Sequence, residues 1–140
     1  MGVPRVLIAD DHEVVLRLLS DLISRDFHLA GAVRNGDELL TQTESLCPDA
    51  IVLDISMPGM TGIEAARRIR ERGYRTPIVF VSDYVDDEIL RAAFDAGGTA
   101  FVSKSLASEE LVSALQTVIA GGTYVSSFLD TDQDPQVSTS

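Results

Sequence analysis

The sequence is poor in several residue types, and each shortage excludes a class of protein or site. One cysteine, Cys47, among 140 residues allows no internal disulfide, and we expect it to be a buried structural thiol in a reducing compartment. No apolar run approaches the length of a membrane span, and the N-terminus lacks the basic and apolar regions of a signal peptide. These absences predict one cytoplasmic globular domain that does not enter a membrane.

Positive charge is scarce as well. The chain has 22 acidic and 11 basic residues, a net charge of −11, and Lys104 is its only lysine. Such a surface repels phosphate backbones, so we expect no direct binding of nucleic acid by this chain. One helix and its exit are rich in arginine, which we interpret as a solvated face rather than a docking surface. These arginines are Arg67, Arg68, Arg70, Arg72 and Arg75.

Short apolar segments alternate with amphipathic ones along the chain. The predicted strands are Arg5–Ala9, Phe27–Val33, Ala50–Leu53, Ile78–Val81 and Thr99–Val102. The predicted helices are His12–Ser24, Asp37–Leu46, Ile63–Arg72, Asp86–Asp95 and a last one, capped by Ser105 or Ser108, that runs through Ala120. This alternation predicts an α/β fold in which a five-stranded parallel sheet carries helices on both faces.

The C-terminal stretch differs from the rest in composition. We expect the folded domain to occupy residues 1–122 and residues 123–140 to form a polar acidic tail or linker that leaves the core. After Leu129 there is no room for even two helices, so we expect no DNA-binding domain in this chain.

Reactive side chains stand at the ends of the predicted strands. Asp10 and Asp11 follow the first strand, Asp54 the third, Ser82 the fourth and Lys104 the fifth. In a parallel sheet these ends share one edge, where ligands bind. Three carboxylates there require a hard cation such as Mg²⁺, and a hydroxyl and an ammonium suit phosphoryl oxygens. Asp54 is therefore predicted to be a nucleophile that forms an aspartyl phosphate, although a lone strand-end Asp commonly only caps a turn.

Four motifs carry a family resemblance. They are ADDHE at Ala9–Glu13, DISMPGMTG at Asp54–Gly62, FVSD at Phe80–Asp83 and FVSK at Phe101–Lys104. From about Val3 to Gly122 the chain resembles the receiver domain of bacterial two-component response regulators. The resemblance implies a flavodoxin-like, doubly wound (βα)5 fold with strand order 2-1-3-4-5.

The resemblance also implies roles for the residues at the strand ends. Asp54 would accept a phosphoryl group from the phosphohistidine of a histidine kinase or of a phosphotransfer protein. Mg²⁺ would be bound directly by Asp11, Asp54 and the backbone carbonyl of Ser56, and mainly through water by Asp10. Lys104 would pair with the phosphoryl oxygens.

A conformational switch is implied too. Ser82 would swing toward the phosphoryl group and Phe101 would turn inward behind it, reshaping the surface of the fourth helix, fifth strand and fifth helix. The ending VSALQTVIAGGTYVSSFL resembles the NarL/FixJ-type subfamily, whose receivers usually precede a DNA-binding domain. A single-domain regulator and the receiver part of a transcriptional regulator both stay open, as does a homodimer.

Some positions depart from the family pattern or carry no assigned role. Ser105 replaces the proline that often follows the lysine, so no cis bond is assumed. Asp83 is predicted to repel anionic phosphodonors and Tyr84 to shade the phosphoryl group, unless both simply face solvent. His12 receives no role because Mg²⁺ prefers oxygen ligands. Met57 and Met60 are interpreted as loop packing.

Three other functions are alternatives to a phosphoacceptor switch. A haloacid-dehalogenase-type phosphatase needs a second Asp two residues after its nucleophile, where this chain has Ser56. A flavin- or dinucleotide-binding module needs a Gly- or hydroxyl-rich first loop, where this chain has Asp10 and Asp11. An interaction module that ignores phosphate stays open. We expect the chain to be a phosphoacceptor switch rather than an enzyme, with at most slow self-catalysed phosphotransfer and autodephosphorylation.

Overall fold

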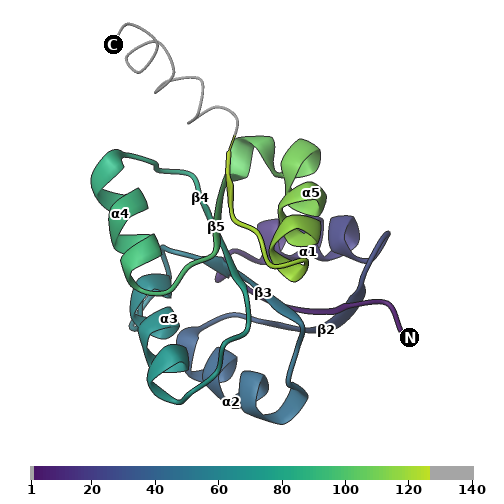
Figure 1. Cartoon of the computed structure of the whole chain (residues 1–140), viewed down its shortest axis with the longest axis horizontal. Helices are drawn as coiled ribbons and strands as arrows, with labels where there is room; N and C mark the ends of the chain where they lie inside the picture. The colour runs from purple at the N-terminus through teal and green to yellow at the C-terminus, as the bar shows by residue number, and fades with distance from the viewer. Residues whose placement is uncertain (1, 127–140) are drawn as a thin grey trace, which may run out of the picture.

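A parallel β-sheet runs through the middle of the protein, with helices on both faces, in a computed structural model that describes residues 2–126 (Figure 1). Its strands are β1 Arg5–Ala9, β2 His28–Val33, β3 Ala50–Asp54, β4 Ile78–Ser82, β5 Ala100–Ser103 and β6 Tyr124–Val125. Their order is β2-β1-β3-β4-β5-β6, and every neighbouring pair is parallel. The predicted flavodoxin-like α/β fold is therefore confirmed.

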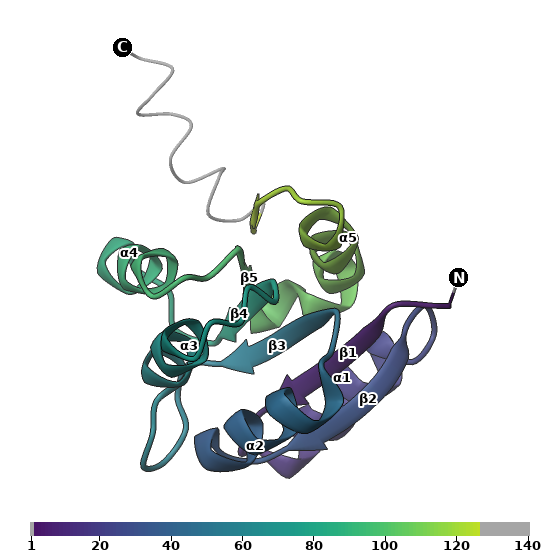
Figure 2. The same ribbon diagram turned by 60° about the horizontal axis from the view of Figure 1, so that its bottom comes forward.

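The helices form two layers. They are α1 Glu13–Ile23, α2 Gly36–Leu46, α3 Gly62–Glu71, α4 Asp87–Asp95 and α5 Ala107–Ile119, with a short 3₁₀ helix η1 at Lys104–Leu106. Figure 2 shows α2, α3 and α4 on one face of the sheet and α1 and α5 on the other. Successive strand residues alternate between the two cores, as in β3, where Ile51 and Leu53 face the first layer and Val52 faces the second. The sheet is thus buried on both faces, as its continuous apolar runs predict.

The expected strand count of five is wrong, because a sixth strand completes the sheet. The backbone N–H of Ser126 donates to the Phe101 carbonyl at 2.9 Å, so β6 covers the edge of β5. The Ser126 hydroxyl and the Glu110 carboxylate, both buried, lie 2.6 Å apart in a hydrogen bond. Without β6, the edge of β5 would expose unpaired backbone groups. Tyr124 and Val125, an aromatic and a β-branched residue, are of types that favour strands. The chain therefore does not leave the core at residue 122, and the rest of the predicted tail, 127–140, lies outside the described residues.

Three smaller expectations are also wrong. Cys47 is exposed, because it ends α2 in a left-handed conformation (φ 46°) at the surface. Neither Ser105 nor Ser108 caps α5: Leu106 is its N-cap residue, because η1 leads directly into the helix. Arg70 does not share the solvated face of its neighbours, since its guanidinium donates to the carbonyls of Tyr74 (2.9 Å) and Gly97 (2.7 Å). Within residues 2–126, no helix is long and apolar enough to cross a membrane.

Candidate functional site

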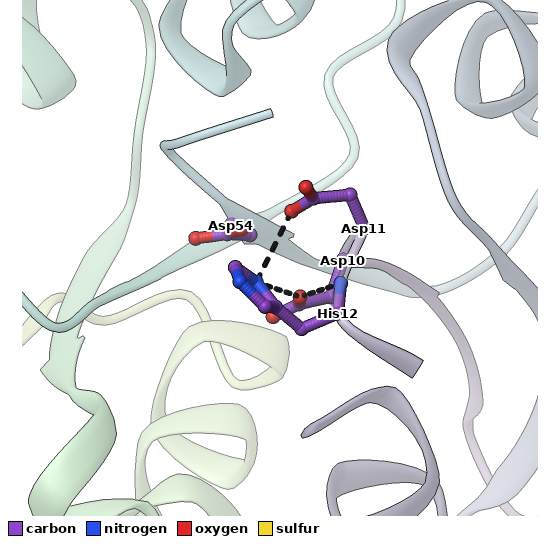
Figure 3. A group of neighbouring side chains, drawn as sticks. All are labelled: Asp10, Asp11, His12 and Asp54. Atoms are coloured by element: carbon purple, nitrogen blue, oxygen red, sulfur yellow. Dashed lines mark hydrogen bonds and ion pairs between the residues drawn. The ribbon is translucent and has the colours of Figure 1, made fainter. Parts of the chain in front are cut away.

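The carboxyl ends of β1, β3 and β5 bring the predicted site residues together. Ala9 pairs with Leu53, which places Asp10 and Asp54 side by side one residue later. The buried Lys104 side chain reaches them from the start of η1, with its ammonium 3.0 Å from Asp10 Oδ2 and 3.2 Å from Asp54 Oδ1. Asp11, at the rim, contributes a carboxylate oxygen that lies within 4.8 Å of those of Asp10 and Asp54 (Figure 3). The predicted acidic cluster with its single ammonium is therefore present.

Burial dominates the electrostatics of this cluster. The Asp10 and Asp54 side chains are 0% and 2% exposed. Burial, and then the neighbouring Asp10 charge, raise the pKa of Asp54 to about 6, although Lys104 and the Ser56 N–H act in the opposite direction. Burial acts to lower the pKa of Lys104, but its hydrogen bonds and charge interactions with both aspartates outweigh burial and raise it. The ammonium is therefore firmly charged, while the carboxylates repel one another.

The donor set fits a hard divalent cation. Asp54 Oδ2 is buried and has no hydrogen-bond partner in the described part of the chain, unlike Oδ1, which contacts Lys104 and the Ser56 N–H. Three carboxylates against one ammonium leave two uncompensated negative charges. An oxygen-rich pocket with that charge suits Mg²⁺. The predicted contribution of the Ser56 carbonyl stays a prediction.

The loop after β3 is held close to the site by a glycine whose role the sequence analysis did not identify. A Cβ on Gly62 would lie 2.1 Å from the backbone oxygen of Asp54, an impossible approach for any other residue. The Gly62 N–H donates to the Ile55 carbonyl at 2.9 Å, and Thr61 caps α3 by accepting the Glu64 N–H. The position of Gly62 at the end of the Asp54–Gly62 motif is the sequence signal for this close approach, because only glycine lacks a Cβ.

The two predicted switch residues occupy defined positions. The Ser82 hydroxyl donates to the Tyr84 carbonyl at 2.8 Å and accepts the Tyr84 N–H at 3.1 Å, so it is turned to its own loop. The Phe101 side chain is fully buried in the core under α3 and α4. Asp83 and Tyr84 are exposed. The roles predicted for all four stay predictions, whereas the packing roles of Met57 and Met60 are confirmed.

A groove adjoins the site between α1 and α5. It has a volume of about 580 Å³, and its lining includes Leu22, Asp83 and Lys104. Two aliphatic side chains of α1, Val14 and Leu18, are 68% and 62% exposed on the same helix. The sequence predicted α1 as amphipathic but did not predict that part of its apolar surface stays open beside the acidic cluster.

Comparisons with known proteins agree with this geometry. The family described as the response regulator receiver domain matches residues 6–116. The nitrate/nitrite response regulator protein NarL of Escherichia coli K12 is 33% identical over 126 residues, which cover 89% of this chain and 58% of that protein. The transcriptional regulatory protein YdfI of Bacillus subtilis 168 is 33% identical over 119 residues, 84% of this chain and 55% of that protein. The chain thus spans little more than half the length of these relatives.

Solved structures give the same result. A LuxR-family two-component response regulator from Aurantimonas sp. SI85-9A1 superposes with a TM-score of 0.84 at 29% identity, covering 88% of this chain and 89% of that one. A LuxR-family DNA-binding response regulator from Staphylococcus aureus gives 0.79 at 28% identity, covering 84% and 99%. Members of this family are signalling switches rather than classical enzymes. The chain belongs to the response regulator receiver domain family of two-component systems.

Proposed function

We propose that Asp54 is the phosphoacceptor of a phosphorylation-activated switch in a cytoplasmic two-component system. One observation carries the proposal: Asp54 Oδ2 is buried and without a hydrogen-bond partner in the described chain, while Oδ1 is fixed by Lys104. One oxygen is thus free to bond to phosphorus or metal while the other is held in place.

The transfer would proceed by direct displacement. Asp54 attacks the phosphorus of a phosphohistidine on a histidine kinase, the P–N bond breaks, and its electron pair stays on the imidazole, which takes up a proton. Asp11, Asp54 and the Ser56 carbonyl would hold Mg²⁺ directly, with Asp10 mainly through water. The metal, when bound, supplies positive charge to the phosphoryl oxygens. Lys104 already lies 3.2 Å from Asp54 and would pair with one of those oxygens.

The response to phosphorylation would begin at Ser82. Its hydroxyl would leave Tyr84 for a phosphoryl oxygen, and Phe101 would adjust behind it. The surface formed by α4, β5 and α5 would then change shape for a partner. We infer a transcriptional output from the names of the relatives, through a protein whose receiver part is this chain or through a single-domain regulator. Direct DNA binding by this chain is not expected, given its net charge of −11.

The kinase would approach over α1. Val14 and Leu18 are exposed on α1, and Leu18 lines the groove that Lys104 also lines. Exposed aliphatic side chains beside a reactive group suit docking of a protein rather than of a small molecule alone. A homodimer remains a second use of such a surface.

The test is labelling of the intact chain with acetyl phosphate, read as the mass of the whole protein with Mg²⁺ and with EDTA. We expect one phosphoryl group on the native chain only with Mg²⁺, none on Asp54→Asn, and normal labelling of Asp26→Asn, a change at an exposed loop position. Catalytic release of phosphate with many turnovers would support a phosphatase instead. Absence of labelling would support an interaction module independent of phosphate.

A further inference from the structure

His12 lies over the acidic cluster. It is the N-cap residue of α1, and its backbone N–H donates to Asp10 Oδ1 at 2.8 Å. Its ring nitrogen Nδ1 lies 3.3 Å from Asp11 Oδ1 and 3.7 Å from Asp10 Oδ1. Figure 3 shows the imidazole turned back toward the carboxylates rather than out into solvent. The side chain is 64% exposed, so packing alone does not impose this direction.

The spacing of these atoms is that of a metal-ligand set. One ligand atom each from Asp10, Asp11, His12 and Asp54 lies within 4.8 Å of the other three. Around an octahedral cation with bonds of about 2.1 Å, ligand atoms are about 3 Å apart when adjacent and about 4.2 Å apart when opposite. The His12–Asp11 separation of 3.3 Å is close to the adjacent value. The limit of 4.8 Å exceeds the opposite value by about 0.6 Å, and the His12–Asp10 separation of 3.7 Å exceeds the adjacent value by about 0.7 Å, so a bound cation would draw these atoms together by up to that amount.

A second observation points to a ligand in the same place. Asp54 Oδ2 is buried without a hydrogen-bond partner in residues 2–126, and Asp54 is 2% exposed. A buried carboxylate oxygen in that state is costly unless a cation meets it. Asp54 and His12 each place an atom in the same group of four, so a carboxylate and an imidazole border one position.

We propose that His12 Nδ1 is a nitrogen ligand in this metal site and shifts its selectivity toward transition-metal cations. The inference rests on the metal site of the proposed function and adds a residue to it. A site made of oxygens alone suits Mg²⁺, whereas imidazole favours ions such as Co²⁺, Ni²⁺ and Zn²⁺. His12 would raise the affinity for these ions while changing the affinity for Mg²⁺ little.

The direct test is spectroscopic and needs no phosphoryl transfer. Mn²⁺ bound to the full-length chain is examined by electron spin-echo envelope modulation, which detects ¹⁴N bonded to the ion. We expect ¹⁴N modulation in the native chain, its replacement by ¹⁵N signals when histidine is labelled with ¹⁵N, and its loss in His12→Ala and His12→Gln. The chain offers a matched control, since His28 is its other histidine and pairs with Arg5 at the opposite end of the sheet. His28→Ala should keep the modulation.

Calorimetric titration supplies the selectivity. We expect His12→Ala and His12→Gln to lower Co²⁺ affinity by about tenfold or more and Mg²⁺ affinity by less than about threefold. If the ring nitrogen only shares a proton with Asp11, Mn²⁺ binds without ¹⁴N modulation and the proposal is wrong. Equal losses of Co²⁺ and Mg²⁺ affinity would also overturn it. Should the native chain be labelled on Asp54 with Mg²⁺ yet show no ¹⁴N coupling, the proposed function stands and only this inference falls.

Discussion

Replacing Asp54 with asparagine should stabilise the metal-free protein at neutral pH. The folded-state pKa of Asp54 is raised from 3.8 to about 6. Each pKa unit corresponds to about 1.4 kcal/mol, so the ionised carboxylate lowers the free energy of unfolding by at most about 3 kcal/mol. Asparagine removes that charge and keeps an acceptor oxygen for Lys104. We expect a gain of about 1–3 kcal/mol at pH 8 in EDTA.

The raised pKa of Asp54 also fixes the direction in which the free energy of unfolding changes with pH. Because the folded-state pKa lies above the unfolded one, the folded protein binds the proton more tightly between about pH 4 and 6. The native chain therefore loses stability as pH rises from about 4 to about 6, and the loss is complete above pH 6 and absent well below pH 4. The advantage of Asp54→Asn should accordingly be large at pH 8, smaller at pH 5 and nearly absent at pH 4.

Urea unfolding measures these differences, with Asp26→Asn as an exposed control that should change stability by less than about 0.5 kcal/mol. Saturating MgCl₂ should narrow the gap, because a ligand at 100 times its Kd stabilises the native protein by about 2.7 kcal/mol and should bind the variant weakly. Two results would refute the inferred cost of the buried Asp54 charge. One is an Asp54→Asn variant that is less stable than the native chain at pH 8 in EDTA. The other is a variant that is more stable by the same amount at every pH.

Three further substitutions test separate contacts. Lys104→Met leaves the buried carboxylates without their ammonium partner and should lower the free energy of unfolding in EDTA by about 3–5 kcal/mol. MgCl₂ should restore part of this loss. A loss that MgCl₂ does not reduce would contradict the explanation by uncompensated negative charge. Ser126→Ala removes a buried hydrogen bond to Glu110 and should cost about 1.5–3 kcal/mol in urea unfolding, whereas a neutral result would show that β6 is not held by it. Asp83→Ala should raise the rate of labelling by acetyl phosphate, and an unchanged rate would count against electrostatic repulsion there.

The sequence predicted the fold well because its strands are continuous apolar runs. Parallel strands buried on both faces leave little choice about where they lie, and the carboxyl-end residues follow from that topology. The sequence alone therefore predicts that Asp10, Asp54 and Lys104 lie together. The sequence does not predict β6, because a run of two residues is too short to show strand periodicity. These residues are Tyr124 and Val125.

Local chemistry was harder to predict than topology. Cys47 was expected to be buried from its type alone, but the end of a helix and a left-handed backbone place it at the surface. Its spacing groups Arg70 with its exposed neighbours, yet its guanidinium donates to the carbonyl of Tyr74, just after α3, and to that of the distant Gly97. The direction of the His12 ring depends on an exposed side chain's rotamer, which no sequence pattern encodes.

The energy of the switch cannot come from Ser82 alone, and this yields a last prediction. In the proposed switch, its hydroxyl would give up two hydrogen bonds with Tyr84, at 2.8 and 3.1 Å, worth about 0.5–1.5 kcal/mol each. It would gain one of about 1.5–3 kcal/mol with a charged phosphoryl oxygen. The net change therefore lies between a loss of about 1.5 and a gain of about 2 kcal/mol, whereas reversing a 1:99 population needs about 5.5 kcal/mol.

Phe101 adds no new burial, since its ring is already enclosed. We propose that part of the remaining energy comes from Lys104, which would exchange its contact with Asp54 for one with a phosphoryl oxygen at the end of β5. Beryllofluoride with Mg²⁺ mimics the phosphoryl group on Asp54, and it should alter amide hydrogen exchange in the loop after Ser82. It should also alter exchange of the Ser126 amide, because that amide donates to the Phe101 carbonyl and joins β6 to β5. Asp54→Asn should show neither change. Exchange altered only in the Ser82 loop would mean that β5 does not transmit the signal.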